Sequence, residues 1–269
     1  MARTYLITGA SGIGAETAKL LAEDAATREI RLFLVALDEV SCESLASDLK
    51  SSGAKVAYVA GDLTTPSVAV EAVASCMNHF GRIDGLFNVA GGSGRRFGDG
   101  PIHECTEEGW SRTIEENATT SYRMCREVIN VMLRQPLSEI GERGVILNMS
   151  SILAIYPEPA HFDTVAYAAS KGAILTMSRS MAASYANSKI RVNVVAPSLV
   201  STAMSARASR DPLISEFIER KQPLLGGMIP ASDVASVCKF LLTDASRAMT
   251  GQIVEVDAGW SISLPAIVS

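Results

Sequence analysis

The sequence predicts an α/β fold, a doubly wound parallel sheet of about seven strands with helices on both faces, in a single domain. Short apolar runs alternate with longer segments of helical period along the whole chain, which is the pattern of βαβ units. A glycine-rich turn joins the first apolar run to the first helical segment. The 269 residues, 48% of them hydrophobic, can bury a substantial core, and no linker, repeat or low-complexity tract divides them. We therefore expect residues 1–269 to form one domain.

The expected strands are short runs rich in valine, isoleucine and leucine. In chain order they are residues 4–8, 30–36, 55–60, 85–90, 144–150, 190–196 and 253–257. Between them, apolar residues recur at helical spacing and predict helices at approximately 13–25, 41–52, 66–80, 106–134, 166–186 and 231–243. Strict alternation of the two kinds of segment favours a parallel sheet that is buried on both faces.

Three segments interrupt this alternation. They are the glycine-rich stretch at about 92–103, the proline-containing stretch at 152–164 and the long segment at 198–230. Each follows the carboxyl end of an expected strand, and ligands of open α/β sheets bind outside those ends. We expect these three segments to form the walls of a substrate site.

Composition and charge argue against several classes of function. A net charge of −5, with no arginine-rich stripe, offers no basic field to nucleic acid. The five cysteines are an odd number without CxxC spacing, which favours a reducing compartment over a disulfide framework. The three histidines are too dispersed for a local metal motif, so we expect no catalytic metal.

A membrane location is not expected either. The glycine-rich turn begins after only eight residues, which leaves no room for the charged and apolar regions of a signal peptide. The apolar stretch at 166–186 is interrupted by Lys171 and Arg179 and is too polar to span a bilayer. We therefore expect a cytoplasmic protein.

The glycine-rich turn has the composition of a dinucleotide site. Gly9, Gly12 and Gly14 lie between the first strand and the first helix. Glycines let the backbone turn sharply and approach a pyrophosphate, and a helix N-terminus offers that anion free N–H groups. A glycine pattern alone is a modest signal, and its strand–turn–helix setting strengthens it.

A possible acid and base lie one helical turn apart in the run YAASK at 167–171. Tyr167 and Lys171 are at positions i and i+4, which share one face of a helix. The lysine ammonium should favour the phenolate and lower the pKa of Tyr167 from its usual value near 10. A solvated pair on a helix surface would show the same spacing, so other residues must decide.

Three runs together resemble the short-chain dehydrogenase/reductase family: TGASGIG at 8–14, NVAG at 88–91 and YAASK at 167–171. The resemblance extends over nearly the whole chain and implies a Rossmann-like fold. It also implies an oxidoreductase that interconverts a secondary alcohol and a ketone by hydride transfer with NAD or NADP. The sequence departs from the family pattern in its glycine turn, which has two rather than three residues between the first two glycines, and at Val89 and Ser198.

The resemblance implies four catalytic residues. Tyr167 would be the general acid/base, and Ser151 would donate a hydrogen bond to the substrate carbonyl. Lys171 would lower the tyrosine pKa and bind the nicotinamide ribose. Asn117 would hold a water beside the lysine, although an asparagine inside a helix can also be a tolerated polar residue on its surface.

The end of the second strand should determine which cofactor is bound. An acidic residue there accepts hydrogen bonds from the adenosine ribose and repels a 2′-phosphate. Asp38 is the acidic candidate, and neither Ser11 nor Leu37 is basic, so we expect NAD in preference to NADP. Asp38 could instead be an ordinary helix N-cap.

The remaining cofactor contacts come from the resemblance. Asp62 would contact the adenine, or else cap the next helix, and Asn88 would tie the central strands together. Pro197 would turn the chain over the nicotinamide, and the Val200 backbone would pair with its carboxamide. Thr202 would reach the carboxamide or a phosphate. The full expected cofactor site is Gly9, Ser11, Gly12, Ile13, Gly14, Asp38, Asp62, Leu63, Asn88, Ala90, Gly91, Tyr167, Lys171, Pro197, Val200 and Thr202.

Several residues in the variable segments stay open. His161 and Phe162 could touch substrate or be exposed loop residues. Arg95 and Arg96 suggest an acidic substrate, although a solvated loop pair is the commoner explanation. Trp260 is expected to pack in the core or at a subunit contact.

The family's subunit contacts use helices like those expected at 106–134 and 166–186, which implies a homodimer or homotetramer. Two other functions are compatible with the fold, since fold does not fix function. One is a non-catalytic dinucleotide-binding regulatory protein, and the other is a lyase or epimerase that uses bound NAD transiently. The substrate class is not indicated, because the three variable segments have mixed polarity.

Overall fold

The computed structural model describes residues 2–263 and contains a seven-stranded parallel sheet. The spatial order of its strands is β3-β2-β1-β4-β5-β6-β9. The chain adds strands on one side of β1 up to β3 and then on its other side from β4, so the switch point lies between β1 and β4. The strands are β1 (Arg3–Thr8), β2 (Ile30–Ala36), β3 (Lys55–Ala60), β4 (Gly85–Asn88), β5 (Gly144–Met149), β6 (Ile190–Pro197) and β9 (Ile253–Val256). All seven strands expected from the sequence are confirmed.

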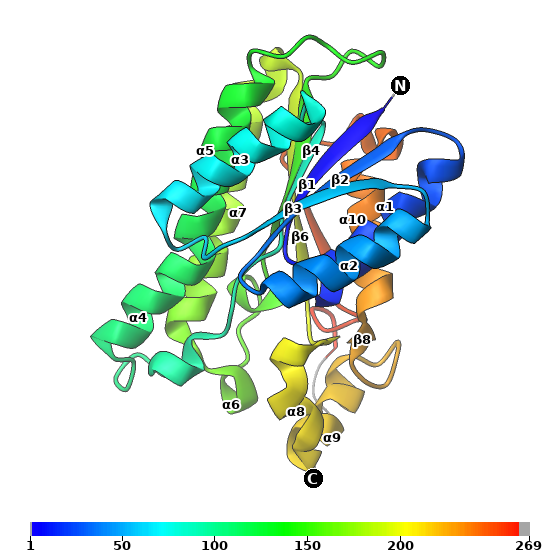
Figure 1. Ribbon diagram of the computed structural model, residues 1–269. Helices are drawn as coiled ribbons and strands as arrows, with labels where there is room; N and C mark the ends of the chain where they lie inside the picture. The colour runs from blue at the N-terminus through cyan, green and yellow to red at the C-terminus, as the bar shows by residue number, and fades with distance from the viewer. Residues whose placement is uncertain (1, 264–269) are drawn as a thin grey trace.

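Helices cover both faces of this sheet, as Figure 1 shows. On one face lie α1 (Gly12–Ala22), α2 (Glu39–Ser51) and α10 (Ala231–Leu242). On the other lie α3 (Pro66–Phe80), α5 (Thr120–Met132) and α7 (Val165–Tyr185), with α4 (Glu107–Ile114) beyond them. Each face carries its own apolar core, in which the sheet packs against the helices of that face. The doubly wound Rossmann-like architecture expected from the sequence is therefore confirmed.

Local sequence explains where these helices begin and end. Pro66 occupies the first turn of α3, where its missing N–H costs nothing, and Gly81 ends that helix with a φ of 71°. Asp38 caps α2 by accepting a hydrogen bond from the Ser41 backbone N–H at 2.9 Å. These local signals explain both ends of α3 and the start of α2.

The helix expected at 106–134 is not continuous. A π-helical turn, Glu115–Thr119, separates α4 from α5. The segments expected as loops also contain short helices, namely α6 (Pro159–Phe162), α8 (Ala206–Arg210) and α9 (Pro212–Lys221). A two-stranded parallel pair, β7 (Val200–Ser201) and β8 (Ile229–Pro230), closes the last of these segments.

These short elements depend on tertiary packing rather than on a long apolar period. Ala208, Ile214, Ile218 and Trp260 are buried together in a third, smaller core beneath α8 and α9. The remaining single turns are 3-10 helices at Glu23–Ala26, Gly94–Phe97, Ile152–Ala154, Ala186–Ser188, Ala203–Ser205 and Asp244–Ser246.

No helix within residues 2–263 combines the length and the apolarity that crossing a lipid bilayer requires. In the same part of the chain, no three His, Cys, Asp or Glu side chains lie close enough together to hold a metal ion.

Candidate active site

A cavity of about 320 Å³ lies at the carboxyl ends of the central strands. The three segments that interrupt the strand–helix alternation, 92–103, 152–164 and 198–230, each contribute residues to its lining. The same cavity collects most of the residues that the sequence nominates. They are Gly9, Ser11, Gly12, Ile13, Ala90, Gly91, Ser151, Tyr167, Lys171, Pro197, Val200 and Thr202.

The glycine turn closes despite being one residue shorter than the family pattern. A Cβ added at Gly14 would lie 2.7 Å from the Gly9 carbonyl oxygen, so the first turn of α1 packs directly on the end of β1. Val89 supports this arrangement, because its Cγ1 would be 3.0 Å from the same Cβ. Gly14 itself is buried and does not line the cavity. Its role is to close the turn.

The two serines at the end of β5 have different partners. The Ser150 hydroxyl donates to the Lys171 carbonyl at 2.8 Å and so anchors α7 to the sheet. The Ser151 Oγ accepts from the Leu153 N–H at 3.2 Å, which begins the 3-10 turn, and it hydrogen-bonds the Tyr167 side chain. Ser151 lines the cavity without such an anchoring bond to the Lys171 carbonyl.

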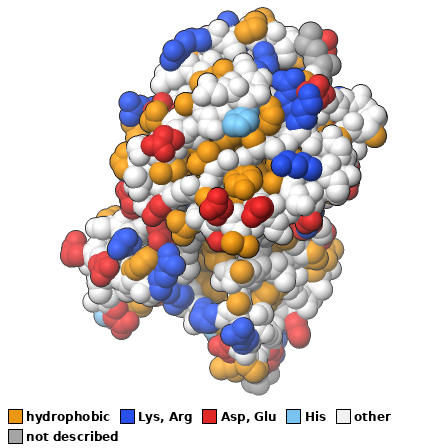
Figure 2. Space-filling view, in the orientation of Figure 1, with side chains coloured by type: hydrophobic (Ala, Val, Ile, Leu, Met, Phe, Trp, Pro, Cys, Tyr) orange, Lys and Arg blue, Asp and Glu red, His pale blue; other side chains and the backbone are white. Residues whose placement is uncertain are grey.

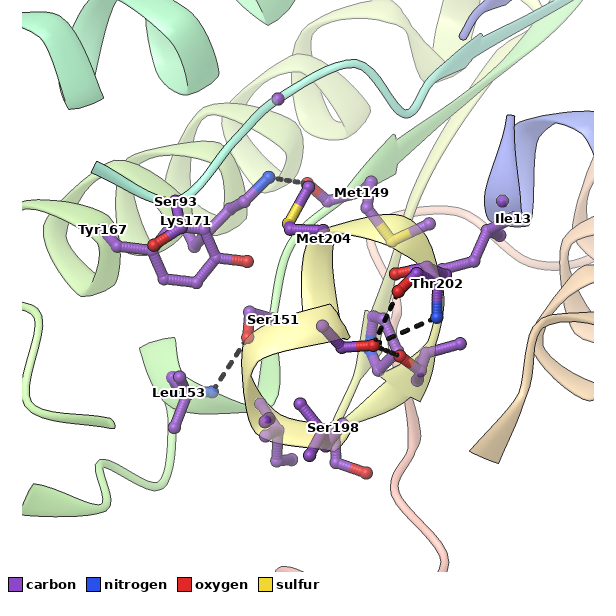
Figure 3. A pocket seen from close by; sticks show the side chains of 18 of the residues that line it. Ile13, Ser93, Met149, Ser151, Leu153, Tyr167, Lys171, Ser198, Thr202 and Met204 are labelled. Atoms are coloured by element: carbon purple, nitrogen blue, oxygen red, sulfur yellow. Dashed lines mark hydrogen bonds between the residues drawn. The ribbon is translucent and has the colours of Figure 1, made fainter. Parts of the chain in front are cut away.

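Tyr167 and Lys171 both face the cavity from one side of α7, and Figure 3 shows the tyrosine hydroxyl pointing into it above Ser151. The Lys171 Nζ lies 5.6 Å from the centroid of the Tyr167 ring and donates to the Met149 carbonyl at 3.3 Å. Only 3% of Lys171 is exposed. The ammonium therefore lies over the ring face rather than beside the hydroxyl.

This geometry overturns the expected pKa of the tyrosine. Burial raises the pKa of the Tyr167 phenol above its ordinary value of 10.0, and the Ser151 hydrogen bond only partly opposes that rise. Burial also lowers the pKa of Lys171 from 10.5 to about 8. The expectation of a lowered tyrosine pKa is wrong for this structure, because desolvation of the phenolate outweighs an ammonium that does not contact it.

The π-helical turn explains the asparagine inside a helix. Asn117 is fully buried there, and its Nδ2 donates to the carbonyls of Thr113 at 2.9 Å and Gly92 at 3.0 Å. Its Oδ1 accepts from the Gly92 N–H at 3.3 Å. A Cβ at Gly91 would collide with this oxygen and lie 3.3 Å from the Lys171 Nζ. Asn117 and Lys171 thus flank the Gly91 backbone, and π turns are frequent at functional sites.

A residue that the sequence interpretation missed positions the helix bearing the tyrosine. Asp99, buried in the glycine-rich segment, accepts from the backbone N–H groups of Ala166 and Tyr167, each at 2.9 Å. The N-cap residue of α7, Thr164, makes no side-chain cap. A carboxylate from a segment distant in sequence instead accepts the hydrogen bonds of the first turn. The signal available in the sequence was one aspartate among the glycines of GDG, at 98–100.

Replacing Asp99 with alanine will loosen the start of α7. The two N–H groups lose their acceptor, so we expect the free energy of unfolding to fall by about 1–2 kcal/mol. Turnover will fall by about tenfold because Tyr167 loses its fixed position. Urea unfolding and steady-state kinetics measure the two effects.

Asp99→Asn should recover part of both losses, since it retains one acceptor oxygen. Glu104→Ala is the matched control, because it removes an exposed carboxylate from the same connection. Unchanged kinetics in Asp99→Ala would show that Asp99 does not position the tyrosine.

The other nominated residues lie outside the cavity lining. The Asp38 side chain caps α2, and Asp62 bonds the Thr64 N–H at 2.9 Å in a local turn. Leu63 is buried in the core. Asn88 donates to the Asn148 Oδ1 at 2.8 Å and so ties β4 to β5.

The structure also separates the residues left open by the sequence. Phe162 lines the cavity and His161 does not. Arg95 lines it, whereas Arg96 pairs with Glu116 at 2.7 Å. Further lining residues that sequence reasoning did not nominate include Val89, Ser93, Met149, Leu153, Met204, Arg207 and Ala208. Ser198 replaces the family glycine without strain, since its φ is not positive.

The cradle fits a dinucleotide on structural grounds. The glycine turn brings α1 to the cavity without side chains, and Thr202 lies over it, with its Cγ2 3.2 Å from a Cβ built on Gly12. The N–H groups at the start of α1 suit a pyrophosphate. Gly9, Ser11, Gly12 and Ile13 are the residues that would hold it.

Comparisons with known proteins agree with this geometry. Residues 7–261 match the family described as enoyl-(acyl carrier protein) reductase. The chain is 31% identical over 259 residues to the 3-oxoacyl-(acyl-carrier-protein) reductase FabG of Chlamydia muridarum, covering 96% of each chain. It is 27% identical to the 2,5-dichloro-2,5-cyclohexadiene-1,4-diol dehydrogenase LinX of Sphingobium indicum, covering 97% of each.

A solved short-chain type dehydrogenase/reductase from Mycobacterium ulcerans superimposes with a TM-score of 0.85 at 28% identity, covering 97% of this chain and 90% of that one. These relatives are named as reductases and dehydrogenases, which does not favour a regulatory protein, a lyase or an epimerase. The chain belongs to the short-chain dehydrogenase/reductase family and is an NAD(P)-dependent oxidoreductase that acts on alcohol and ketone groups.

Proposed function

We propose that catalysis in this enzyme rests on Ser151, Tyr167, Lys171 and Asn117. The observation that carries the proposal is that the first three line one cavity with the glycine turn, while Asn117 is buried behind its wall. Interconversion of a secondary alcohol and a ketone requires a hydride to move to or from the carbon and a proton to move to or from the oxygen bonded to it. The arrangement provides a proton donor, and a hydrogen-bond donor for the developing oxyanion, on one side of that cavity.

Bound NAD(P) supplies or accepts the hydride. In the reductive direction, the Tyr167 hydroxyl donates its proton to the substrate oxygen while Ser151 stabilises the developing negative charge. The raised pKa of Tyr167 keeps the phenol protonated at neutral pH, which suits reduction. In the oxidative direction the phenolate must form first, so the same residue acts as the base only as pH rises.

Lys171 and Asn117 would support these two residues. The Lys171 amine lies at the cavity wall between the Tyr167 ring and the Met149 carbonyl, where it can bind the nicotinamide ribose. Asn117 fixes Gly92 and the adjoining Gly91 backbone against the cavity. Both residues position the reacting groups and do not themselves exchange the hydride.

An absorbance screen at 340 nm tests the proposed function. The purified enzyme would be offered NADH or NADPH with neutral ketones and keto acids, and NAD or NADP with the corresponding alcohols and hydroxy acids. We expect cofactor oxidation by at least one class of ketone and dependence of that rate on Tyr167. Substrate conversion without any net change in NADH would contradict the proposal and support an isomerising or eliminating reaction.

We further propose that NAD is preferred over NADP. No lysine or arginine occurs at 9–14 or 36–41, the segments at the ends of β1 and β2, so a 2′-phosphate would lack a cationic partner there. The Asp38 carboxylate at the start of α2 would instead repel it. Its hydrogen bonds with Ser41 lower the pKa of Asp38 and keep it charged at neutral pH. The cap and the ribose contact can coexist because a carboxylate has several acceptor positions.

Asp38→Ser separates the two roles of this residue. Serine is a good N-cap, so the free energy of unfolding should change by less than about 0.5 kcal/mol. Loss of the negative charge should lower the kcat/KM ratio of NADH to NADPH by about tenfold. Asp48→Ser, on the same helix, is the control. An unchanged ratio would remove Asp38 from cofactor selection.

We also propose a cytoplasmic homotetramer or homodimer. The five cysteines are free in the structure, which suits a reducing compartment. The α4 and α5 segment carries the exposed aromatic side chains Trp110 and Tyr122, which suit a helical subunit contact. Sedimentation equilibrium distinguishes a dimer from a tetramer, and a monomer would contradict the proposal.

A further inference from the structure

The cavity has a reactive end and an apolar wall. Ser151 and Tyr167 mark the reactive end. The wall includes Leu153, Phe162 and Trp260, and the last two form an edge-to-face aromatic pair with ring centroids 5.9 Å apart. Such a surface binds the hydrocarbon part of a substrate. Apolar contacts do not fix the orientation of a ligand, so a polar anchor is expected elsewhere in the cavity.

Two arginines provide cations on the same lining. Arg95 belongs to the 3-10 turn after β4, and Arg207 belongs to α8, so they reach the cavity from different segments. Both keep part of their side chain in contact with solvent. The Arg95 Nη2 donates to the His161 carbonyl at 3.1 Å, which fixes its guanidinium at the rim. Figure 2 shows basic side chains on both sides of the hollow between the α4 end of the molecule and α8–α9.

Neither guanidinium is neutralised by an ion pair. Among residues 2–263, no carboxylate lies within 4.0 Å of Arg95 or Arg207, whereas the adjacent Arg96 is paired with Glu116. Partial burial, followed by the charge of Arg207, lowers the pKa of Arg95, and Asp99 and Asp163 oppose that effect. Asp99 is already committed to the start of α7. Both arginines therefore line one cavity without a carboxylate ion pair among the described residues, in a protein whose net charge is −5.

We propose that the substrate carries a carboxylate that binds Arg95 and Arg207 at the cavity rim while its alcohol or ketone carbon lies at Ser151 and Tyr167. This inference rests on the proposed function. It assigns a substrate class to a site that the family resemblance leaves open. That class is a keto acid or hydroxy acid with an apolar carbon skeleton. A guanidinium is well suited to the task because its planar donors match a carboxylate.

A matched pair of ketones tests the proposal. The probes are 4-oxocyclohexanecarboxylate and its methyl ester, which have the same ring and carbonyl and differ in charge. With NADH and wild-type enzyme, we expect kcat/KM for the carboxylate to exceed that for the ester by about tenfold. Raising KCl from low to high concentration should reduce this preference, because salt screens exposed charges.

Arginine variants assign the effect to the two residues. Arg95→Gln and Arg207→Gln should each lower kcat/KM for the carboxylate by about tenfold and leave that for the ester within about twofold. Arg96→Gln and Arg210→Gln are the controls, because each lies in the same local element but does not line the cavity. Equal losses on both ketones, or a raised KM for NADH in either cavity variant, would overturn the proposal.

Direct binding decides the matter if neither ketone is reduced. Isothermal titration of the NADH-loaded enzyme should show tighter binding of the carboxylate than of the ester, and equal affinities would overturn the inference. Failure of the proposed function is a different result, since it would appear as no oxidation of NADH or NADPH by any ketone of the wider screen.

Discussion

Tyr167→Phe will lower turnover by about 10²–10⁴-fold and leave cofactor binding nearly unchanged. The substitution removes the only atom of this side chain that can exchange a proton and retains the ring that packs beside Lys171. NADH binding is measured by fluorescence titration, and turnover by absorbance at 340 nm. Wild-type rates in Tyr167→Phe would exclude the tyrosine as the acid/base.

The pH dependence provides a second measure of the same residue. Because burial raises the pKa of Tyr167, wild-type alcohol oxidation should increase as pH rises through the alkaline range, while ketone reduction stays efficient at pH 7. The residual oxidation by Tyr167→Phe should lack this increase. Tyr185→Phe, at the other end of α7, is the matched control and should retain the wild-type profile.

Lys171→Met will stabilise the protein and inactivate it. Burial lowers the pKa of Lys171 to about 8, so folding at pH 7 forces a charged amine into a desolvated position. The shift from 10.5 corresponds to an order-of-magnitude cost of about 3 kcal/mol, which methionine avoids. We expect a rise in unfolding free energy of up to about that amount and a loss of turnover of about 10²-fold.

The sign of the pH effect follows from the two protonation states. Below pH 8 the amine is protonated both in the folded and in the unfolded chain, and the full cost of burial is present. Between pH 8 and 10.5 the folded protein binds fewer protons than the unfolded chain, so its stability rises with pH. The stability difference between Lys171→Met and wild type should therefore be largest at pH 7 and smallest near pH 10.5.

Urea unfolding at several pH values measures this difference directly. Lys50→Met is the control, because it changes the same residue type at an exposed position in α2. A Lys171→Met variant that is less stable than wild type at pH 7 would show that packing or hydrogen bonding of the amine outweighs its desolvation.

Sequence reasoning succeeded where local pattern and tertiary structure agree. The apolar runs of the strands and the helical period at 66–80 are local signals, and both are confirmed by the observed strands and by α3. Tyr167, Lys171 and most residues of the glycine turn line one cavity, because local structure fixes which way a short turn or one helix face points.

It failed where the deciding contact is remote in sequence. The pKa of Tyr167 depends on the burial of its phenol and on its hydrogen bond with Ser151, and neither can be derived from i and i+4 spacing. Asp99 and Arg207 reach the site only through tertiary folding of their segments. The short helices α8 and α9 are stabilised by a small core that includes Trp260, so their own sequence contains too few turns to reveal them.

The hydrogen bonds from Ala166 and Tyr167 to Asp99 have a consequence for altering this enzyme by loop exchange. A glycine-rich connection transplanted from another enzyme to change selectivity would also remove the acceptor that closes the first turn of α7. The segment that would be exchanged to change selectivity therefore also contains the residue that holds the start of the helix bearing Tyr167. A functional chimera would need the connection and the beginning of that helix to be exchanged together, from the same donor enzyme.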